Sequence, residues 1–428
     1  MGLLLDFAYL VACIVASPWL VYRLCGPGRR DLAMRFGFGL GEPSSSSIWL
    51  HGSSAGEISV LRPLVAALER DYPGTPLVIS AFTATGLTTA RKLYSRHRVV
   101  PLPFDFSFVV ARYLRRFNPR LLVVAESEFW PNLIGVAHER GVPVALVNGK
   151  MSAKSFRVHV RTGLIPRVLG QLDLLAVQTE EHAQRLRALG VEPGKLHVTG
   201  NMKYDLTHAV STADPVELRR ALGYGPTDVV IIGGSLHDQE DEALLDAYAR
   251  AREVGADAAL VIVPRYPGDA EAVEQRARAR GYSATRKTAV DAGTVPAPGR
   301  GGVLVVDTVG ELGRLYAIAD LAFVGGSLFF RGANKGGHNL MEPAILGVPV
   351  LFGPYNFSFK ETVDDLLAAN AGRLVHDAAE LTAAVGVLVA DRNARRELGQ
   401  RAQQVVLAGQ GATSRNYALL AKLLRARP

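Results

Sequence analysis

The chain has 428 residues, of which 48% are hydrophobic and 21% charged, with a formal net charge of +8. This composition excludes a disordered chain, and the length exceeds what one hydrophobic core usually serves. The two cysteines, Cys13 and Cys25, both fall near the N-terminus, which excludes a disulfide framework and fits a reducing compartment. A basic surface suits nucleic acid, anionic lipid or phosphorylated substrates, and charge alone does not choose among them.

The N-terminal segment predicts a membrane anchor over residues 1–30. Phe7–Tyr22 carries no charge, Asp6 precedes it, and four arginines follow it: Arg23, Arg29, Arg30 and Arg35. A cleaved signal peptide would carry its positive charge before the apolar run. We therefore expect a retained anchor, as a short span or an interfacial helix, that holds the body on the cytoplasmic side against anionic lipid. The alternative is a buried amphiphilic helix.

Beyond residue 47, short β-rich runs alternate with helical patterns, which predicts parallel sheets covered by helices. We expect an N-terminal Rossmann-like domain at 47–206, a linker at 207–226 and a C-terminal Rossmann-like domain at 227–428, facing each other across a cleft. The expected strands of the first are Ile48–Leu50, Leu77–Ala81, Leu121–Ala125, Val144–Val147, Leu174–Gln178 and His197–Thr199. Those of the second are Val229–Gly233, Ala259–Pro264, Val303–Asp307, Leu321–Gly325, Val350–Phe352 and Arg373–Val375. Residues Thr285–Gly302 are expected to form a loop.

The stretch that follows the first strand allows two interpretations of Glu57. Ser53 or Ser54 could cap the next helix, with Glu57 as the capping-box partner. Alternatively, Glu57 lines the cleft as a general base, beside helix N–H groups that favour an anion. Spacing alone does not choose between them.

Further charged residues follow other strands of the first domain. Glu126 and Glu128 come directly after a strand, and an acid buried there without a partner would be costly, so we expect Glu126 to lie in the cleft. The alternative is a pair of solvated loop acids. Lys203 also follows a strand and could neutralise a developing negative charge, or it could be a surface lysine.

In the second domain, Arg265 follows a strand, where a guanidinium suits a phosphate or carboxylate. The glycine-rich stretch Gly336–Pro354 places Asn339 and Glu342 at the start of a short helix, a pattern that suits a nucleotide phosphate and its ribose hydroxyls. A further helix start carries Gly310 and Glu311.

Three acids, Asp238, Glu240 and Asp241, look like a metal cluster. They lie where a helix begins, and we interpret them as first-turn acids, which the helix dipole favours.

Six segments in this order resemble the transferases of 3-deoxy-D-manno-octulosonic acid (Kdo). The matching segments are His51–Glu57, Glu126–Asn132, Gly200–Lys203, Pro264–Arg265, Asp307–Leu312 and Gly336–Pro343. The resemblance implies a membrane-associated glycosyltransferase of the GT-B type. It would move Kdo from CMP-Kdo to a lipid A precursor (lipid IVA) at the cytoplasmic face of the inner membrane, in lipopolysaccharide synthesis.

The resemblance also implies roles for single residues. Glu57 is similar to the family's proton acceptor, and Glu126 and Lys203 to its transition-state stabilisers. The implied CMP-sugar contacts are Pro264, Arg265, Val309, Gly310, Glu311, Asn339, Leu340, Met341 and Glu342.

The chain departs from the family pattern at three places. Lys150 stands where an arginine is usual, Tyr266 stands where a histidine is common, and Phe329–Lys335 is similar to an insertion that reshapes or covers the donor pocket.

The mechanism expected from these features is a direct, inverting displacement with Glu57 as the base. A leaving group with one phosphate needs no metal in principle, and no other cofactor is expected. Two alternatives remain: another GT-B transferase that uses a UDP-sugar, and a catalytically silent, membrane-tethered protein that binds a nucleotide sugar. A nucleic-acid partner is suggested only by net charge, and no interleaving of aromatic and basic residues supports it.

Overall fold

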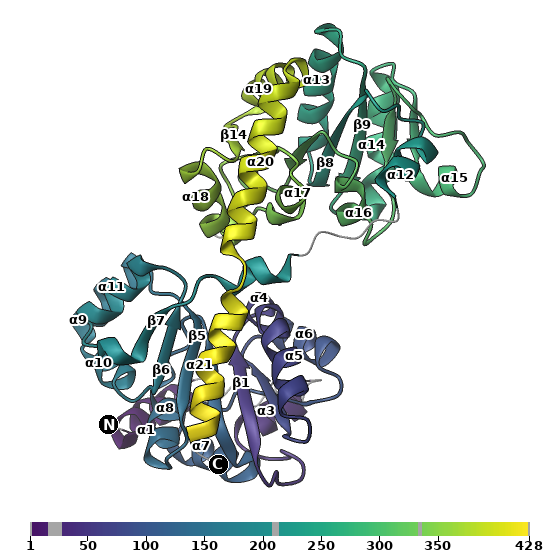
Figure 1. Cartoon of the computed structure of the whole chain (residues 1–428). Helices are drawn as coiled ribbons and strands as arrows, with labels where there is room; N and C mark the ends of the chain where they lie inside the picture. The colour runs from purple at the N-terminus through teal and green to yellow at the C-terminus, as the bar shows by residue number, and fades with distance from the viewer. Residues whose placement is uncertain (1, 16–27, 208–213, 333–335, 427–428) are drawn as a thin grey trace. The chain divides into compact units, whose positions relative to one another are not determined.

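The computed structural model of the protein describes residues 2–15, 28–207, 214–332 and 336–426 (Figure 1). The chain divides into two units. The first unit comprises Met1–Leu206 together with Gly409–Pro428, and the second unit comprises Thr207–Ala408. Within the described residues, each unit has its own sheet of seven strands with helices packed on it (Figure 1).

The sheet of the first unit is entirely parallel, with the strand order β3-β2-β1-β4-β5-β6-β7. Its strands are β1 (Ser47–Gly52), β2 (Leu77–Ala81), β3 (Arg98–Pro101), β4 (Pro119–Ala125), β5 (Val144–Gly149), β6 (Leu174–Val177) and β7 (Leu196–Val198). Its longer helical elements are α1 (Gly2–Val15), α3 (Arg29–Arg35), α4 (Ala55–Val60), α5 (Arg62–Asp71), α6 (Ala84–Leu93), α7 (Ser107–Phe117), α8 (Pro131–Glu139), α9 (Ala153–Thr162), α10 (Leu164–Leu169), α11 (Glu180–Ala188), the 3-10 helix η2 (Met202–Leu206) and α21 (Ala412–Ala426).

Strand β1 shows why this sheet is covered on both faces. All of its residues are buried, and side chains alternate between the two faces of a strand. Ile48 and Leu50 pack into one core cluster, whereas Trp49 packs into the other, where its ring stacks on Tyr113 of α7 with the centroids 5.7 Å apart. Strands buried on both faces read as continuous apolar runs, which is the pattern that predicted them.

The second unit is built in the same way, with the strand order β10-β11-β9-β8-β12-β13-β14 and parallel pairs throughout. Its strands are β8 (Val229–Leu236), β9 (Ala258–Pro264), β10 (Ala284–Arg286), β11 (Val303–Val305), β12 (Leu321–Val324), β13 (Val350–Phe352) and β14 (Arg373–Leu374). Its helices are α12 (Pro215–Ala221), α13 (Glu240–Glu253), α14 (Ala270–Ala279), α15 (Lys287–Asp291), α16 (Leu312–Tyr316), α17 (Met341–Ile345), α18 (Lys360–Ala368), α19 (Ala378–Ala390) and α20 (Arg392–Gly409).

The predicted limit of the second domain at residue 428 is wrong, because the last helix belongs to the first unit. Leu420 and Leu424 of α21 are buried in a core cluster of the first unit. In addition, the Asp205 carboxylate accepts hydrogen bonds from the backbone N–H groups of Gly411 (2.6 Å) and Thr413 (2.5 Å). The chain therefore returns to its first unit after completing the second.

The predicted linker at 207–226 is also wrong in its second half. Residues 208–213 lie outside the described residues, but α12 follows directly, and Leu218, Leu222 and Tyr224 are buried in a core cluster of the second unit. An apolar face three and four residues apart is the signal of a packed helix.

Two short edge strands were not predicted. Strand β3 is one of them, and β10 is the other; β10 and α15 occupy the start of the stretch expected to be a loop at Thr285–Gly302. Both strands are short and each includes an arginine, so neither presents the continuous apolar run by which most of the other strands were predicted.

The expected anchor is only partly covered, because residues 16–27 lie outside the described residues. Its first part is α1, which packs against α7 and α8 of the first unit. In the described part of the chain, no helix combines the length and the hydropathy that crossing a membrane requires.

Candidate functional site

The first part of the site is Glu57, which lies at the third position of α4, directly beyond the carboxyl end of β1. Its carboxylate accepts hydrogen bonds from the Ser53 backbone N–H (2.8 Å) and the Ser54 hydroxyl (3.0 Å). In return, the Ser54 hydroxyl accepts from the Glu57 N–H (3.3 Å). The capping interaction is therefore present with Ser54 as the N-cap, and it holds the Glu57 carboxylate in one place.

Glycines allow this tight arrangement. A Cβ atom at Gly52 would lie 3.1 Å from the Cβ of Glu57, and one at Gly86 of α6 would lie 2.6 Å from the Ser53 carbonyl oxygen. A side chain at Gly86 would therefore push α6 away from the turn that carries Glu57.

Two further acids, Glu126 and Glu128, follow β4, and together with Glu57 they form what we call the acid cluster. Glu128 accepts a hydrogen bond from the Trp130 indole N–H (2.7 Å), and its carboxylate lies 3.4 Å from Nε2 of His51. His51, the next-to-last residue of β1, is fully buried, and its Nδ1 lies 3.0 Å from the Ser80 hydroxyl. His51 thus joins the ends of β1 and β2 to the loop after β4.

Within the acid cluster, the pKa values of Glu57 and Glu128 are shifted in opposite directions. Burial raises the pKa of Glu57; the hydrogen bond from Ser53 opposes this, and the charges of Glu126 and Glu128 add to it. Burial also raises the pKa of Glu128, but hydrogen bonds from His51 and Trp130 outweigh burial and leave that pKa lowered. Paired carboxyl groups with diverging pKa values suit divided acid–base roles.

Glu126 is held in a strained conformation. Its φ angle is +57°, in the left-handed region, and its side chain is 5% exposed. Its carboxylate forms an ion pair with Lys150 (2.5 Å) and accepts a longer hydrogen bond from the Asn148 amide (3.4 Å). Lys150 therefore meets the charge of Glu126, although it lacks the two-pronged geometry of an arginine. Strain of this kind persists only where the surroundings impose it.

Lys203 lies on η2, which packs against α4, the helix that carries Glu57. Asn148 connects this element to Glu126, because its side-chain oxygen accepts from the Met202 N–H (2.9 Å) while its amide donates to Glu126. The segments that carry Glu57, Glu126 and Lys203 thus all lie beyond the carboxyl ends of the parallel strands of the first unit.

The second unit contains a cavity of about 740 Å³ that we call the basic cavity. Arg265, which directly follows β9, lines it together with Arg331 and two histidines, His237 and His338. Tyr266 also lines it and packs edge-on against His237, with ring centroids 5.9 Å apart. Arginines and aromatic rings in one hollow suit an anion attached to a flat group.

The two histidines of the basic cavity stack in parallel, with their Nε2 atoms 3.0 Å apart. Burial, followed by the charges of His237, Arg265 and Arg331, lowers the pKa of His338 to about 4. Burial, with Arg331 next in effect, also lowers the pKa of His237. Both rings are therefore neutral near pH 7, and the positive charge of the cavity belongs to its arginines.

Beside the basic cavity, Asn339 and Glu342 organise the start of α17. The Asn339 side chain accepts from the Met341 N–H (3.1 Å) and donates to the Glu342 carboxylate (3.1 Å). Burial raises the pKa of Glu342, and the bond from Asn339 opposes this. Leu340 and Met341 are buried, so a ligand would meet them through their backbone.

The remaining predicted contacts lie between β11 and α16. Val309 is 85% exposed and Gly310 has a φ of +93°. The Glu311 carboxylate forms an ion pair with Lys287 (2.8 Å). Burial raises the pKa of Glu311, but Lys287 and Thr308 outweigh burial and lower it. Pro264 ends β9 directly ahead of Arg265.

Glu240 and Asp241 lie in the first turn of α13, as predicted. The same prediction is wrong for Asp238, which precedes the N-cap residue Gln239 and lines the basic cavity. The buried Glu240 carboxylate accepts four backbone N–H groups, from His237, Gly326, Ser327 and Leu328, at 2.7–2.9 Å. Asp241 pairs with Arg276 (2.6 Å). Among the described residues, no group of three or more His, Cys, Asp or Glu side chains is placed to hold a metal.

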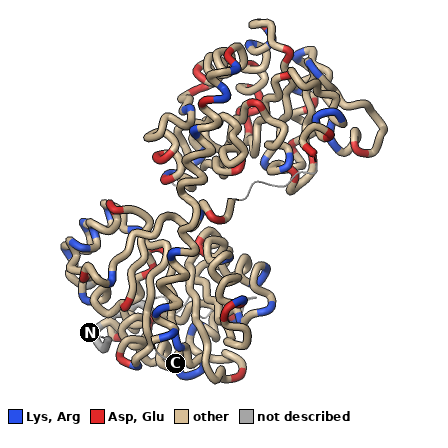
Figure 2. The backbone as a smooth tube through the Cα atoms, in the orientation of Figure 1, with Lys and Arg blue, Asp and Glu red and all other residues tan. Residues whose placement is uncertain are grey.

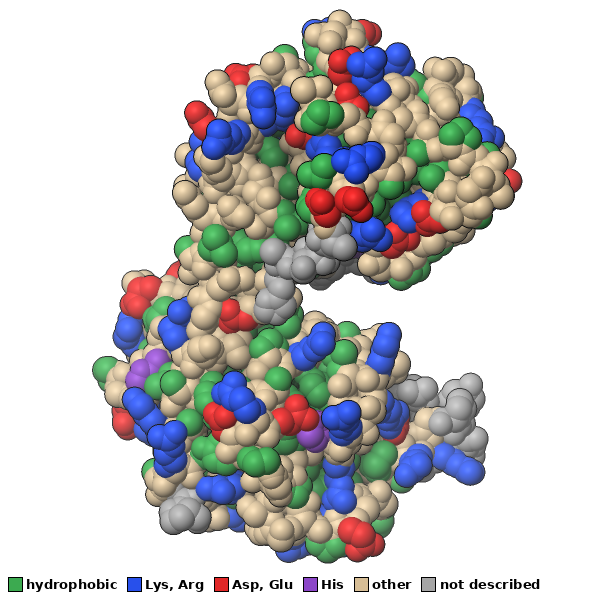
Figure 3. Space-filling model, turned by 45° about the vertical axis from the view of Figure 1, so that its right-hand side comes forward, with side chains coloured by type: hydrophobic (Ala, Val, Ile, Leu, Met, Phe, Trp, Pro, Cys, Tyr) green, Lys and Arg blue, Asp and Glu red, His purple; other side chains and the backbone are tan. Residues whose placement is uncertain are grey.

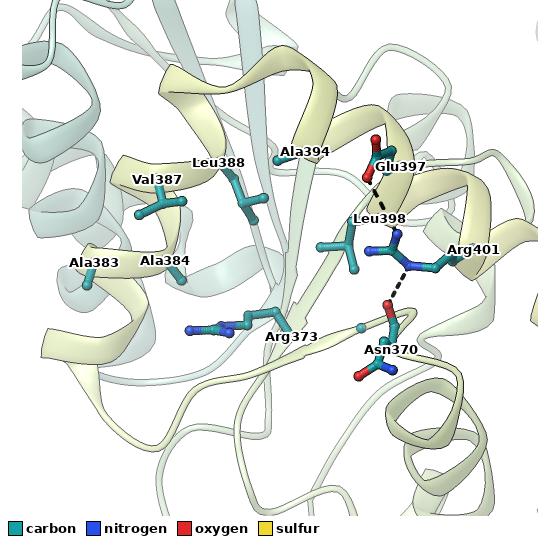
Figure 4. Close-up of a pocket in the computed structure, with 11 residues that line it drawn as sticks. Asn370, Arg373, Ala383, Ala384, Val387, Leu388, Ala394, Glu397, Leu398 and Arg401 are labelled. Atoms are coloured by element: carbon teal, nitrogen blue, oxygen red, sulfur yellow. Dashed lines mark hydrogen bonds and ion pairs between the residues drawn. The ribbon is translucent and has the colours of Figure 1, made fainter.

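Phe329, Phe330 and Arg331, at the start of the predicted insertion, line the basic cavity, whereas residues 333–335 lie outside the described residues. A second hollow of about 410 Å³ lies between α19, α20 and the start of β14 (Figure 4). There Arg401 donates to the Asn370 carbonyl (2.7 Å) and faces Glu397. None of the predicted site residues lines this hollow, so we place the candidate donor site in the basic cavity.

Sequence reasoning assigned no separate role to four residues that the structure places in these sites: His51, Asn148, His237 and Arg331. Three of them shared one signal, because His51 and Asn148 lie in the last two residues of their strands and His237 directly follows β8. The carboxyl ends of parallel strands are where ligands bind in such folds.

Comparison with known proteins adds independent findings. A sequence model of the family described as 3-deoxy-D-manno-octulosonic-acid transferase (kdotransferase) matches residues 30–206. The 3-deoxy-D-manno-octulosonic acid transferase of Haemophilus influenzae is 31% identical over 405 residues, which cover 92% of this chain and 91% of that protein. The protein of the same name from Bordetella pertussis is 33% identical over 384 residues, covering 87% of this chain and 86% of that one.

Solved structures resemble the chain in fold. A putative UDP-N-acetylglucosamine 2-epimerase from Listeria monocytogenes matches with a TM-score of 0.56 and 15% identity, over 89% of this chain and 97% of that one. MurG from Acinetobacter baumannii matches with a TM-score of 0.54 and 14% identity, over 89% of this chain and all of that one. At these identities the likeness shows the fold alone, which is the predicted GT-B fold of two Rossmann-like domains.

Proposed function

Because this chain belongs to the Kdo transferase family, we propose that it transfers Kdo from CMP-Kdo to a lipid A precursor, lipid IVA, with Glu57 as the general base. The observation that carries this assignment is the environment of Glu57. Two hydrogen bonds fix its carboxylate, while burial and two neighbouring acids raise its pKa. A base is more effective when its pKa lies closer to the working pH.

In the proposed reaction, a sugar hydroxyl of the acceptor attacks the anomeric carbon of Kdo, and its proton passes to Glu57. The bond from that carbon to the phosphate oxygen breaks, CMP leaves, and the configuration at the carbon inverts. Glu126, with its Lys150 partner, and Lys203 stabilise the charge that develops in the transition state.

We place the donor in the basic cavity. Arg265 and Arg331 offset the charge of the CMP phosphate and the Kdo carboxylate, and Tyr266 offers an aromatic face. The partly buried Glu342 carboxylate, oriented by Asn339, accepts hydrogen bonds from the ribose hydroxyls in this proposal. One phosphate asks for less charge neutralisation than two, so the arginines suffice without a metal.

The acceptor is a lipid, and we propose that α1 anchors the protein at the cytoplasmic face of the inner membrane, against anionic lipid. Four apolar side chains of α1 are exposed: Phe7 (67%), Leu10 (53%), Val11 (46%) and Ile14 (64%). Exposed apolar side chains in a row suit a lipid surface. On the face of the first unit shown in Figure 3, Lys and Arg side chains mix with hydrophobic ones. Figure 2 shows basic residues spread over both units.

The test is a transfer assay with CMP-Kdo and a tetraacyl lipid A precursor in detergent, with the product identified by its mass. Glu57→Gln and Glu57→Ala should each lower kcat by roughly 100-fold or more, because general base catalysis contributes about 10²–10⁴-fold. Glu139→Gln, at the exposed end of α8, is the matched control and should be unaffected. Near-normal turnover in both Glu57 variants would remove that residue from the base role.

Two additions to the assay test the donor and the metal. CMP should compete with the donor far better than UDP, whereas stronger competition by UDP would favour a UDP-sugar transferase. Turnover should persist in a chelator, and loss that magnesium restores would contradict the metal-free mechanism. Nucleotide binding without transfer to any lipid acceptor would indicate a silent binding protein.

A further inference from the structure

Helix α1 is docked with its polar residues turned toward the protein. The Asp6 carboxylate accepts hydrogen bonds from the Ser107 N–H (2.8 Å), the Ser107 hydroxyl (2.5 Å) and the Asn132 amide (3.0 Å). Tyr9 donates its hydroxyl to Asp105 (3.3 Å) and packs edge-on against Phe106. The apolar side chains that point outward therefore occupy the face where a soluble helix would carry its charges.

These bonds satisfy two helix ends that lack caps of their own. The N-cap residues of α7 and α8 are Phe106 and Trp130, and neither supplies a side-chain cap. Asp6 instead accepts the first N–H of α7, and Asp105 accepts the N–H groups of Asn132 (3.0 Å) and Leu133 (2.8 Å) at the start of α8. Orphan N–H groups at a helix start need such partners.

Asn132 connects the two caps. One hydrogen of its buried side-chain amide goes to Asp6, and the other goes to the backbone carbonyl of Asp105 (2.6 Å). Asn132 is the second residue of α8, and the loop between the end of β4 at Ala125 and the start of α8 at Pro131 carries Glu126 and Glu128. Both ends of that loop are thus fixed, one by the sheet and the other by contacts that include α1.

We propose that Asp6 and Tyr9 are positioning residues for Kdo transfer: by holding Asn132 and Asp105, they set the start of α8 and hence the geometry of the loop that carries Glu126 and Glu128. Helix α1, the proposed membrane anchor, then also determines the positions of Glu126 and Glu128 in the acid cluster. This inference rests on the proposed function of the acid cluster and of α1.

The experiment compares Asp6→Ala, Asp6→Asn and Tyr9→Phe in the full-length chain, assayed in mixed micelles with CMP-Kdo and a tetraacyl lipid A precursor. An asparagine at position 6 can still accept from Ser107 but loses one of the two carboxylate oxygens. We therefore expect kcat to fall in the order wild type, Asp6→Asn, Asp6→Ala, with a loss of roughly tenfold for Asp6→Ala, as a small misplacement of reacting groups would cause. The KM for CMP-Kdo should stay unchanged, because the donor residues lie in the second unit.

A spectroscopic readout follows the loop directly. The Trp130 indole N–H donates a hydrogen bond to Glu128. The wavelength of maximum Trp130 fluorescence emission should therefore shift in Asp6→Ala and, less strongly, in Tyr9→Phe. A Trp19→Phe background removes one other tryptophan, and Trp49 is fully buried. The matched control is Glu139→Gln at the exposed end of α8, which should leave both kcat and Trp130 emission unchanged.

The outcomes separate the possible failures. Wild-type kcat and wild-type Trp130 emission in Asp6→Ala would overturn the inference. So would a loss of kcat that merely matches the loss of folded protein, measured by circular dichroism on the same sample, because general destabilisation lowers the amount of active enzyme and leaves KM unchanged. If Asp6→Ala unfolds, the graded effect of Tyr9→Phe, which removes one hydroxyl, decides instead. If Glu57→Gln is impaired while the Asp6 and Tyr9 variants are normal, the inference alone fails; if Glu57→Gln is also normal, the assignment of the acid cluster fails.

Discussion

Glu57 and Glu128 are both partly buried acids of one cluster, yet their pKa values move in opposite directions. The difference lies in their donors. Glu128 faces the imidazole of His51 and the indole N–H of Trp130, whereas Glu57 has a serine N–H and hydroxyl as donors and lies near two negatively charged neighbours. Local donors, rather than burial alone, therefore decide in which direction the pKa of each carboxyl group moves.

This difference gives a prediction for the pH profile. The proposed base role requires Glu57 without its proton, so the acid limb of kcat/KM should follow the raised pKa of Glu57 and lie above the range of an ordinary glutamate. Glu128→Gln removes a neighbouring negative charge that raises this pKa. The acid limb should therefore move to lower pH in Glu128→Gln and stay in place in the control Glu139→Gln. A limb that moves to higher pH would contradict the assignment.

The residue types at the acid cluster could be predicted from the sequence, because acids that directly follow apolar strands stand out. Their partners could not. No sequence pattern near Glu126 indicates that the Asn148 side chain forms hydrogen bonds with both Glu126 and the backbone of Met202, because those hydrogen bonds join β5 to segments far away in the chain. The sequence also left two interpretations of Glu57 open, and the structure shows that its capping contacts and its raised pKa coexist.

At the scale of elements, Glu240 connects the loops that follow two neighbouring strands of the second unit, β8 and β12. Its carboxylate at the start of α13 gathers the backbone N–H groups that follow β8 and β12. This bonding fixes the turn at Gly325–Leu328, which leads into Phe329 and Phe330 of the basic cavity. The three acids that resemble a metal cluster in the sequence thus include one that serves as an internal anion for backbone donors.

We predict that Glu240→Ala destabilises the second unit. It leaves four backbone N–H groups without their acceptor, and hydrogen bonds to charged groups are worth about 1.5–3 kcal/mol each, so a loss of roughly 3 kcal/mol or more in unfolding free energy is expected. Urea unfolding measures this loss of unfolding free energy. The control Glu242→Ala, at an exposed position of the same helix, should change the unfolding free energy little. CMP binding should also weaken in Glu240→Ala. An unchanged midpoint would show that water replaces the carboxylate.

At the scale of the whole molecule, the chain leaves its first unit once and comes back. Helix α21 completes the first unit by packing on α5 and η2, and the amide of its Asn416 donates a hydrogen bond to the Thr199 hydroxyl (2.9 Å). The first unit therefore includes α21 in its core, and its two segments are held together by buried apolar side chains and by the hydrogen bonds of Asp205 and Asn416.

Removing residues 410–428 should consequently destabilise the first unit and spare the second. Leu420 and Leu424 are buried, and at about 1.5–3 kcal/mol for each large apolar side chain the loss is roughly 3–6 kcal/mol. Hydrogen exchange followed by mass spectrometry should show lost protection in β1 and β4 and retained protection in β8 and β9. Leu420→Ala should give part of the effect and Lys422→Ala none. Equal loss in both units would contradict this division.

By itself the sequence determined two parallel-sheet domains and most of the strand positions, because strands buried on both faces need continuous apolar runs. It also indicated the candidate acids, lysine and arginine, because in such folds ligands bind beyond the carboxyl ends of the strands, where these residues lie. Only the tertiary structure decided that α12 and α21 complete cores far from their neighbours in the chain, that Glu240 serves backbone donors, and that α1 turns Asp6 inward to Ser107 and Asn132. These features depend on contacts between residues distant in sequence, and no local pattern of hydrophobicity or charge encodes which distant partner a buried side chain will meet.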